Sequence, residues 1–361
     1  MTAHVSASDF ALLNDNPPPP GLKAVEVTTA DKVRLRCAVS APKDGPTRGT
    51  VLILQGRNET IEKYFETMAD LNRRGFMAAA FDWRGQGGSA SRPAKGERGR
   101  PPRPGDGRRA GYVRRFKGYV DDLEAVIHDL LLPDCRPPYA ILAHSSGALV
   151  ALSASERLTN RIERMVLSGP FVALPPGSPP LGLMRFVALS LRLLGFGHLP
   201  VRRAVLPGNM GTPAENPLTH DPRRFARNRH LAESHPELFV GPPTVGWLAA
   251  VTGAMRRLQR SDVVARLSIP TLFVCAGGDR VVSTPAAEQL AWRMRTASSL
   301  TLPGARHELL QEADRHREPL LAAMETFFSE ALPFPDPADA AWADGMKADG
   351  DNARSSAEAA E

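Results

Sequence analysis

The feature that most constrains the fold of this 361-residue chain is a serine placed between an apolar run and a helical pattern. Residues 139–143 have the composition of a buried strand, and residues 148–152 begin a helical pattern. Ser145 stands on the turn between them, flanked by the small residues Ala143 and Gly147. Small residues at these positions let a strand and a helix approach closely, as in a nucleophile elbow. A simple helix cap is the alternative, since serine is a favoured N-cap residue.

Ser146 is the alternative nucleophile, but that choice would place His144 and Ala148 at the two tight positions of the turn. The small residues fit better when the turn is centred on Ser145, and we therefore assign Ser145 as the nucleophile. Because His144 directly precedes this serine, we expect its side chain to pack behind the turn.

Apolar runs typical of buried strands alternate with helical patterns on both sides of this turn. The expected strands are residues 22–29 and 32–41, which form a hairpin, and 50–54, 76–81, 139–143, 162–167, 271–276 and 299–302. The expected helices are residues 60–74, 120–132, one between the last two strands, and 320–328. This alternation predicts an α/β fold with a mostly parallel sheet and helices on both faces.

The strand pattern stops between residues 168 and 269, a gap too long for a simple connection. We interpret this gap as a helical cap inserted over the catalytic edge of the sheet. The expected segments are a disordered leader (1–20), the first part of the core (21–168), the cap (169–268), the second part of the core (269–332) and an acidic disordered tail (333–361).

The composition is that of a soluble globular protein, with 42% apolar and 23% charged residues. The three cysteines, Cys37, Cys135 and Cys275, are far apart and form no disulfide framework or metal-binding pair, which suits a reducing compartment. The first residues lack a basic region followed by an apolar one, so no secretory signal is predicted. We expect a cytoplasmic protein, and a peripheral position at the inner membrane face stays open.

The net charge of +6 is unevenly distributed along the chain. Residues 333–361 contain seven acidic and two basic residues, a net charge of −5, so residues 1–332 carry +11. A basic body favours anionic partners such as a membrane surface, a phosphate-bearing substrate or nucleic acid. Charge alone is equally compatible with a well-solvated basic surface.

Two residues at the ends of later strands complete a catalytic set. A serine nucleophile needs a base to take its proton and an acid to orient that base. Asp279 follows the strand at 271–276, and His307 follows the strand at 299–302. Parallel strands bring their carboxyl ends to one edge of the sheet, so Ser145 should meet both residues there. Alone, the aspartate could cap a turn and the histidine could be solvated, but their order and placement predict a triad.

Two further assignments remain, namely the role of a second candidate acid and the N–H groups that bind the oxyanion. Asp82 follows another strand, but residues 83–87 suggest a structural turn that shapes the site. The tetrahedral intermediate needs N–H donors, and one should be the backbone N–H of Ser146. The other should come from the loop at residues 55–59, where we favour the N–H of Arg57 over that of Gly56.

Several segments carry a family resemblance. Residues 55–59, 82–89 and 143–147 resemble the monoglyceride-lipase and serine-aminopeptidase-like branch of the α/β-hydrolases, and within it the bacterial lysophospholipases. Four shorter segments add to the resemblance, which covers residues 22–330: they are residues 111–116, 119–123, 218–221 and 307–310.

The resemblance implies an α/β-hydrolase fold and a serine hydrolase that cleaves the acyl ester of a lysophospholipid or monoacylglycerol without metal or cofactor. Its triad falls by position on Ser145, Asp279 and His307. Ala143 replaces the usual first glycine of the elbow, and Ser146 stands where the family often has methionine. These two differences leave acyl-chain and head-group preference open.

Other functions are weighed against lysophospholipid hydrolysis. A monoacylglycerol lipase or a general carboxylesterase would use the same residues on another ester. Aminopeptidase activity is a weaker option suggested by the name of the branch. A non-catalytic binding protein would need a broken triad, and the sequence contains an intact one.

Residues 181–197 are apolar except for Arg185, Ser190 and Arg192. The arginines are seven positions apart and would share one helix face, but the segment is short and charged for a membrane span. We interpret it as a helix in the plane of the lipid headgroups with its arginines towards phosphates. A cap helix buried against the core is the alternative.

A second basic stretch could also meet anionic lipid or form a solvated loop. It has no interleaved aromatic residues for base stacking, so we predict no nucleic-acid partner. Its basic residues are Arg92, Lys95, Arg98, Arg100, Arg103, Arg108 and Arg109.

Overall fold

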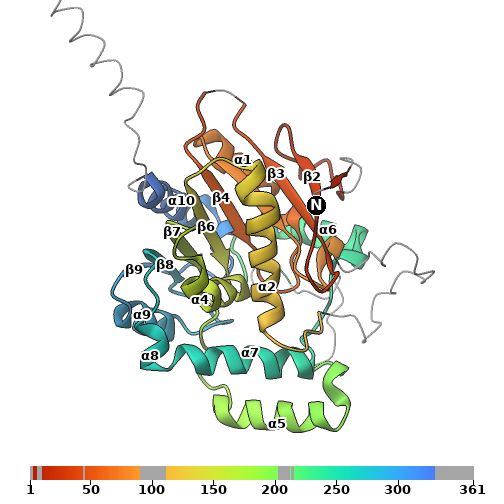
Figure 1. Ribbon diagram of the computed structural model, residues 1–361, viewed down its shortest axis with the longest axis vertical. Coiled ribbons are helices and arrows are strands. Elements are labelled where there is room, and N and C mark those ends of the chain that lie inside the picture. The colour runs from red at the N-terminus through yellow and green to blue at the C-terminus, as the bar shows by residue number, and fades with distance from the viewer. Residues whose placement is uncertain are drawn as a thin grey trace, which may run out of the picture.

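The computed structural model describes residues 3–5, 10–43, 45–89, 111–201, 212 and 215–329. Its centre is a nine-stranded sheet with the order β1-β2-β3-β5-β4-β6-β7-β8-β9 (Figure 1). The pairs β1–β2, β2–β3 and β3–β5 are antiparallel. The pairs β5–β4, β4–β6, β6–β7, β7–β8 and β8–β9 are parallel. The strands are β1 (Ala3–Val5), β2 (Lys23–Thr28), β3 (Arg34–Ser40), β4 (Thr50–Leu54), β5 (Met77–Phe81), β6 (Tyr139–His144), β7 (Arg164–Ser168), β8 (Thr271–Ala276) and β9 (Ala297–Leu302).

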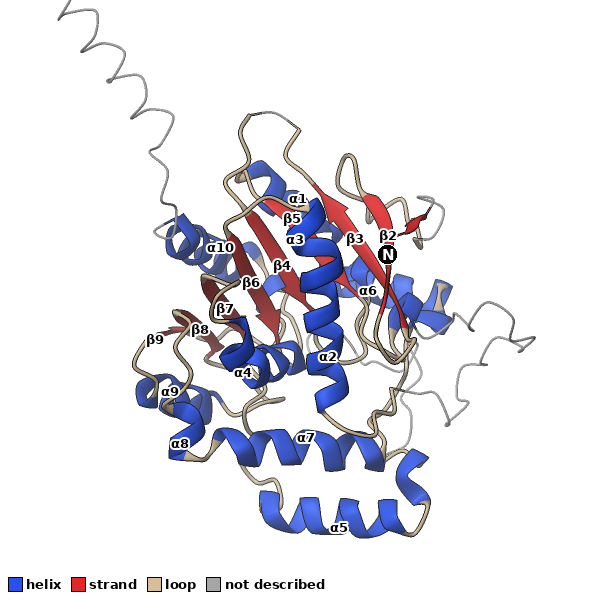
Figure 2. Ribbon diagram, viewed as in Figure 1, coloured by secondary structure: helices blue, strands red, loops and turns tan. Residues whose placement is uncertain are grey.

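Helices cover both faces of the sheet (Figure 2). One face packs against helices α2, α4, α7 and α9, and the other packs against α1 and α10. The helices are α1 (Phe65–Arg73), α2 (Lys117–Val126), α3 (Leu132–Asp134), α4 (Ser146–Leu158), α5 (Leu181–Leu193), α6 (Pro222–Ser234), α7 (Val245–Leu258), α8 (Ser261–Val264), α9 (Thr284–Arg293) and α10 (Asp314–Ser329). The prediction of an α/β fold with a mostly parallel sheet is confirmed.

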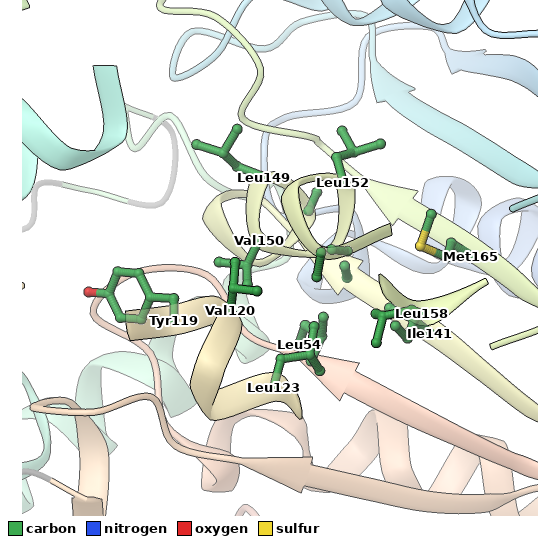
Figure 3. Close-up of a cluster of buried hydrophobic side chains, with 14 of the residues drawn as sticks. Leu54, Tyr119, Val120, Leu123, Ile141, Leu149, Val150, Leu152, Leu158 and Met165 are labelled. Carbon is green, nitrogen blue, oxygen red and sulfur yellow. The ribbon is translucent and has the colours of Figure 1, made fainter. Parts of the chain in front are cut away.

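The central strands are apolar on both faces because each face meets a helical layer. In β4, Leu52 and Leu54 point into the core beneath α2 and α4, and Val51 and Ile53 point towards α1 and α10. The first of these two cores brings side chains of α2 and α4 together over β4 and β6 (Figure 3). Because both faces of the sheet are packed against helices, the position of the edge that carries the site residues is fixed.

The expected strands and helices agree with the structure, with small shifts at their ends. The hairpin is β2 and β3, and the predicted strands at 50–54 and 271–276 have the bounds of β4 and β8. Helix α10 begins at Asp314, before Pro319, so the predicted start at residue 320 was too late. Pro319 lies inside α10, and the helix continues through it although the proline has no N–H to donate.

The predicted disorder of the leader, residues 1–20, is wrong for its described part. Strand β1 pairs with β2 at the sheet edge. The buried Phe10 ring lies 5.7 Å from the Phe65 ring, and the Ala11 N–H donates to Glu62. The Asn16 side chain also donates to the Glu62 carbonyl, so the leader is held by core contacts that its proline-rich composition concealed. The basic stretch at 92–109 and the tail at 333–361 lie outside the described residues.

The segment between β7 and β8 contains α5, α6, α7 and α8. Helix α7 lies beneath α2 and α4, and α5 lies on the far side of α7 (Figure 1). The sequence predicted that Arg185 and Arg192 face lipid phosphates, but Arg185 donates to the Ala249 carbonyl and Arg192 donates to the Arg114 carbonyl. Their predicted orientation is therefore wrong. Among the described residues, no helix combines the length and apolarity needed to cross a bilayer.

Candidate active site

Ser145 occupies a strained turn between β6 and α4. Its φ is +51° and its ψ is −117°, a backbone conformation that residues other than glycine rarely adopt. Two residues later, a Cβ added to Gly147 would lie 2.4 Å from the Leu54 carbonyl oxygen. Ala143 is fully buried. The turn thus needs glycine at 147, and it holds the Ser145 side chain at the carboxyl edge of the sheet.

The three residues predicted from strand order meet at this edge. His307 Nε2 lies 3.0 Å from Ser145 Oγ, and His307 Nδ1 lies 2.8 Å from Asp279 Oδ2. His307 is only 4% exposed. Gly169, just after β7, gives the histidine its space, because an added Cβ would lie 2.8 Å from the His307 carbonyl oxygen.

Asp279 is held as a carboxylate by its hydrogen bonds. Burial opposes its ionisation, but the hydrogen bond and charge of His307 and the backbone N–H groups of Val282 and Val281 favour it. Together they hold the pKa of Asp279 below its usual value. One oxygen accepts the two backbone bonds and the other faces His307, so the carboxylate has one orientation.

His144 packs behind the elbow. It is 3% exposed, and its Nδ1–H donates to the Ser168 carbonyl over 3.0 Å. Burial, with the charges of His307 and Lys63, lowers the pKa of His144 despite the opposing charge of Glu59. A neutral ring therefore lies 5.0 Å from the His307 ring and adds no positive charge behind it at neutral pH.

A buried ion cluster lies beside His144. Lys63 Nζ is 2.7 Å from Glu59 Oε1 and 2.6 Å from Glu308 Oε1, and all three side chains are at most 10% exposed. Burial disfavours the Glu59 carboxylate, but Lys63, His144 and a hydrogen bond from Tyr64 lower its pKa to about 2. The cluster connects the loop after β4 to the residue that follows His307 in sequence.

Asp82, the alternative acid, lies in a different buried network. It accepts from Arg36 Nε at 2.7 Å, from the Ile61 N–H and from the Gly88 N–H. Its side chain is fully buried. These partners shape the turn after β5, as expected for a structural role, and the residue that contacts His307 is Asp279.

The loop at residues 55–59 lies beside the elbow and contacts the cap. The Gly56 N–H donates to Glu59 Oε2. The Arg57 guanidinium donates to the carbonyls of Gly241 and Pro242. It also lies 5.2 Å from the centre of the Trp247 ring. The loop is therefore joined to the cap beside the nucleophile.

The next residue in this loop repeats the connection. Asn58 Oδ1 accepts from the N–H groups of Val240 and Gly241, at 2.7 and 2.9 Å. The Asn58 N–H donates to Gln86 Oε1 at 2.8 Å. With φ at +65°, Asn58 also sets the backbone direction of the loop. These bonds therefore join the cap to the loop.

A hollow opens between α2, α4 and α7 next to Ser146. It is shallow, with room of about 10 Å³ for the centres of water-sized groups. Its lining is mostly aromatic and aliphatic, with Trp83, Phe116, Tyr119, Val150, Trp247 and Val251 around Ser146 and Gln86. Such a surface suits an apolar group next to the nucleophile.

One group of side chains in the described part of the chain has the spacing of a metal site, namely His220, Glu312 and His316. Glu312 accepts hydrogen bonds from three backbone N–H groups, including that of Arg306, and its Oε1 lies 2.6 Å from His220 Nδ1. These partners occupy the carboxylate lone pairs. The group therefore connects the cap to the loop that carries His307.

Comparisons with known proteins identify the family. The family model described as serine aminopeptidase, S33 (Hydrolase_4), matches residues 45–314. The chain belongs to this family. This hydrolase is 26% identical over 291 residues to the probable lysophospholipase L2 of Haemophilus influenzae, covering 79% of this chain and 85% of that protein. It is 29% identical over 293 residues to lysophospholipase L2 of Escherichia coli K12, with 77% and 80% covered.

Solved structures share the fold. A soluble variant of monoglyceride lipase from Saccharomyces cerevisiae has a TM-score of 0.67 and 17% identity, with 88% of this chain and 99% of that chain covered. Together with the family match and the curated relatives, this makes the protein a serine ester hydrolase of the lysophospholipase-like branch.

Sequence reasoning missed the ion cluster of Glu59, Lys63 and Glu308. One signal was present, because Glu59 and Lys63 are four residues apart at the start of a helical pattern. The link from Lys63 to Glu308 joins residues far apart in sequence and has no local signature. Gly169 was missed because its role is to leave room for His307, a residue in the loop after β9.

Proposed function

We propose that this hydrolase cleaves the acyl ester of lysophospholipids through a Ser145–His307–Asp279 triad and an acyl-enzyme intermediate. The observation that carries the proposal is the pair of contacts that His307 makes, 3.0 Å to Ser145 Oγ and 2.8 Å to Asp279 Oδ2. A histidine between a hydroxyl and an ionised carboxylate can take the hydroxyl proton and hold the resulting charge.

In the first step, Ser145 Oγ attacks the ester carbonyl carbon while its proton passes to His307 Nε2. Asp279 holds the Nδ1–H and stabilises the imidazolium. The tetrahedral intermediate collapses, the bond from carbon to the glycerol oxygen breaks, and His307 gives its proton to that oxygen. Water then attacks the acyl-enzyme with His307 as base, which releases the fatty acid and restores Ser145.

We assign the oxyanion donors to the backbone N–H groups of Ser146 and Arg57. Ser146 is the first residue of α4, where backbone N–H groups have no partner within the helix. The Gly56 N–H is engaged by Glu59, which favours Arg57 as the donor from the same loop. The Arg57 and Asn58 side chains hold this loop against the cap and so help to preorganise it.

The substrate assignment rests on the curated relatives and on the surface near the nucleophile. Both bacterial relatives are named lysophospholipases. The apolar side chains around Ser146 suit contact with an acyl chain, which a lysophospholipid shares with a monoacylglycerol. A monoacylglycerol lipase or a general carboxylesterase is therefore the alternative, and the resemblance of the fold to a monoglyceride lipase favours neither ester over the other.

The test compares fatty-acid release from lysophosphatidylcholine and from monooleoylglycerol, for the wild type and for Ser145→Ala. Release mainly from the phospholipid, lost by several orders of magnitude in the variant, is the expected result. Release only from the glyceride would keep the triad and overturn the substrate. Wild-type rates in a folded Ser145→Ala protein would overturn the triad.

Two further assays separate the remaining functions. An aminoacyl-nitroanilide reports peptidase activity, which we expect to be negligible beside ester hydrolysis. A fluorophosphonate probe should label the wild type at Ser145 and leave Ser145→Ala unlabelled. Failure to label the folded wild type would favour a binding protein on a hydrolase scaffold.

A further inference from the structure

Helix α5 has an apolar stripe exposed to solvent. Among the described residues, eight of the eleven exposed large apolar side chains lie between residues 183 and 201. Four are on α5 and a fifth is its C-cap, Leu194, with exposed fractions from 46% to 83%, and the other three follow within residues 196–201. The five are Leu183, Phe186, Val187, Leu193 and Leu194, whose spacing of three, four and seven places them on one side of the helix.

The stripe points away from the rest of the protein. On the opposite side of α5, Ala188 is 2% exposed and packs against Val245 and Ala249 of α7. Helix α5 lies outside α7, at the end of the molecule farthest from the sheet (Figure 1). The polar atoms of Arg185 and Arg192 face protein carbonyls, so the outer face of α5 is left to its apolar side chains.

Among the described residues, the charged side chains of α5 and α7 are all basic. Helices α5 and α7 contain no Asp or Glu. The two helices run antiparallel, because Arg185 lies against Gly253 while Gly197 lies against Gly246. Exposed basic side chains therefore stand at both ends of the stripe. They are Arg114 and Arg115 near the end of α5, and Arg256 and Arg257 near its start.

An apolar face with a basic rim matches one kind of partner. A bilayer with anionic headgroups offers acyl chains to the stripe and phosphates to the arginines. A second copy of the chain would present the same basic rim, so like charges would oppose each other across the contact. The charge pattern therefore favours lipid over self-association.

We propose that the apolar stripe of α5 rests on an anionic phospholipid bilayer, with Arg114, Arg115, Arg256 and Arg257 at the level of the phosphates. The cap then faces the membrane, and the hollow beside Ser146 lies behind α7. This orientation replaces the one expected from the sequence, in which Arg185 and Arg192 pointed to phosphates. It does not depend on which ester the enzyme cleaves.

The test measures binding of the full chain to vesicles of phosphatidylcholine with phosphatidylglycerol by flotation, in a Ser145→Ala background that leaves the lipid intact. Phe186→Ser with Leu193→Ser should lower the partition coefficient by at least about tenfold, since two large apolar groups no longer enter the bilayer. The matched control is Leu12→Ser with Trp292→Ser, which removes equally exposed apolar groups elsewhere and should bind like the parent.

A second pair of variants tests the basic rim. Arg114→Gln with Arg115→Gln should weaken binding to the anionic vesicles and leave any binding to pure phosphatidylcholine unchanged. Parent-like binding by the folded Phe186→Ser, Leu193→Ser protein would overturn the proposal, as would a parent that does not bind vesicles.

A second copy of the chain or another part of the same chain could cover the stripe instead. Each has a distinct experimental signature, and observing either would also overturn the proposal. A dimer in light scattering that the α5 variant abolishes would show that a second copy covers the stripe. A melting temperature lowered in the α5 variant and not in the control would show that another part of the chain covers it. Hydrolysis of a soluble short-chain p-nitrophenyl ester, with Ser145 intact, should be equal in all variants, so failure of vesicle binding is distinguishable from failure of the proposed hydrolase activity.

Discussion

A substitution of Lys63 should show how much more a buried ion pair contributes to the free energy of unfolding than an exposed one. The Lys63 ammonium lies 2.7 Å from Glu59 and 2.6 Å from Glu308, inside the protein. In Lys63→Met both carboxylates would lose their counter-charge while remaining close to each other. Removing one partner of a buried pair destabilises a protein by about 3–5 kcal/mol. We expect a loss in the upper half of this range, because two charges are left unpaired.

The lowered pKa of Glu59, to which Lys63 contributes, gives the same direction and order of magnitude. Lowering its pKa from 4.5 to about 2 corresponds to about 3 kcal/mol of stability at neutral pH. Because the folded-state pKa is depressed, this stability is present above pH 4.5 and is lost as the pH falls towards 2. The difference between wild type and Lys63→Met should therefore be largest at neutral pH and shrink in acid.

The assay is urea-induced unfolding followed by tryptophan fluorescence, at neutral pH and at several acidic values. The control is Lys117→Met, which removes an exposed lysine that pairs with Asp121 at 2.5 Å. Exposed pairs of this spacing contribute about 0.3–0.5 kcal/mol. Adding Glu59→Gln to Lys63→Met should restore part of the stability by removing one unpaired charge. Equal losses in Lys63→Met and Lys117→Met would refute the reasoning.

Two further predictions concern turnover of the ester that the enzyme cleaves. Asp279→Asn should lower kcat by about 10⁴-fold without unfolding the protein, because the amide cannot stabilise imidazolium at His307; kcat within tenfold of wild type would contradict the assigned role. Asn58→Ala should lower kcat by up to about 10²-fold, since the loop loses its bonds to Val240 and Gly241 and the Arg57 N–H is less well placed. Hydrogen exchange should rise at those two amides, and unchanged exchange would show that Asn58 does not hold the cap.

Much of the fold could be predicted because its signals are local. A strand buried on both faces, such as residues 50–54, is apolar throughout, and a helix beside the sheet repeats its apolar residues every three or four positions. The order of strands also predicted that Ser145, Asp279 and His307 would meet. Parallel strands bring their ends to one edge whatever fills the space between them.

Features that join distant segments were decided by tertiary structure. The leader was expected to be disordered from its prolines, but Phe10 found a place against Phe65. Arg185 and Arg192 were expected to face lipid from their spacing. Spacing determines only that two side chains share a helix face, and packing against α7 determines where that face points.

The sequence by itself determined the order of strands and helices, the serine turn and the residues at the strand ends, because each is a pattern within a few consecutive positions. Only the tertiary structure decided that Lys63 pairs with Glu308, that Asn58 binds the cap, and that α5 turns its apolar side outward. The physical reason is that a charge or an apolar face acquires its partner from whatever packing brings beside it, and sequence periodicity does not record that neighbour.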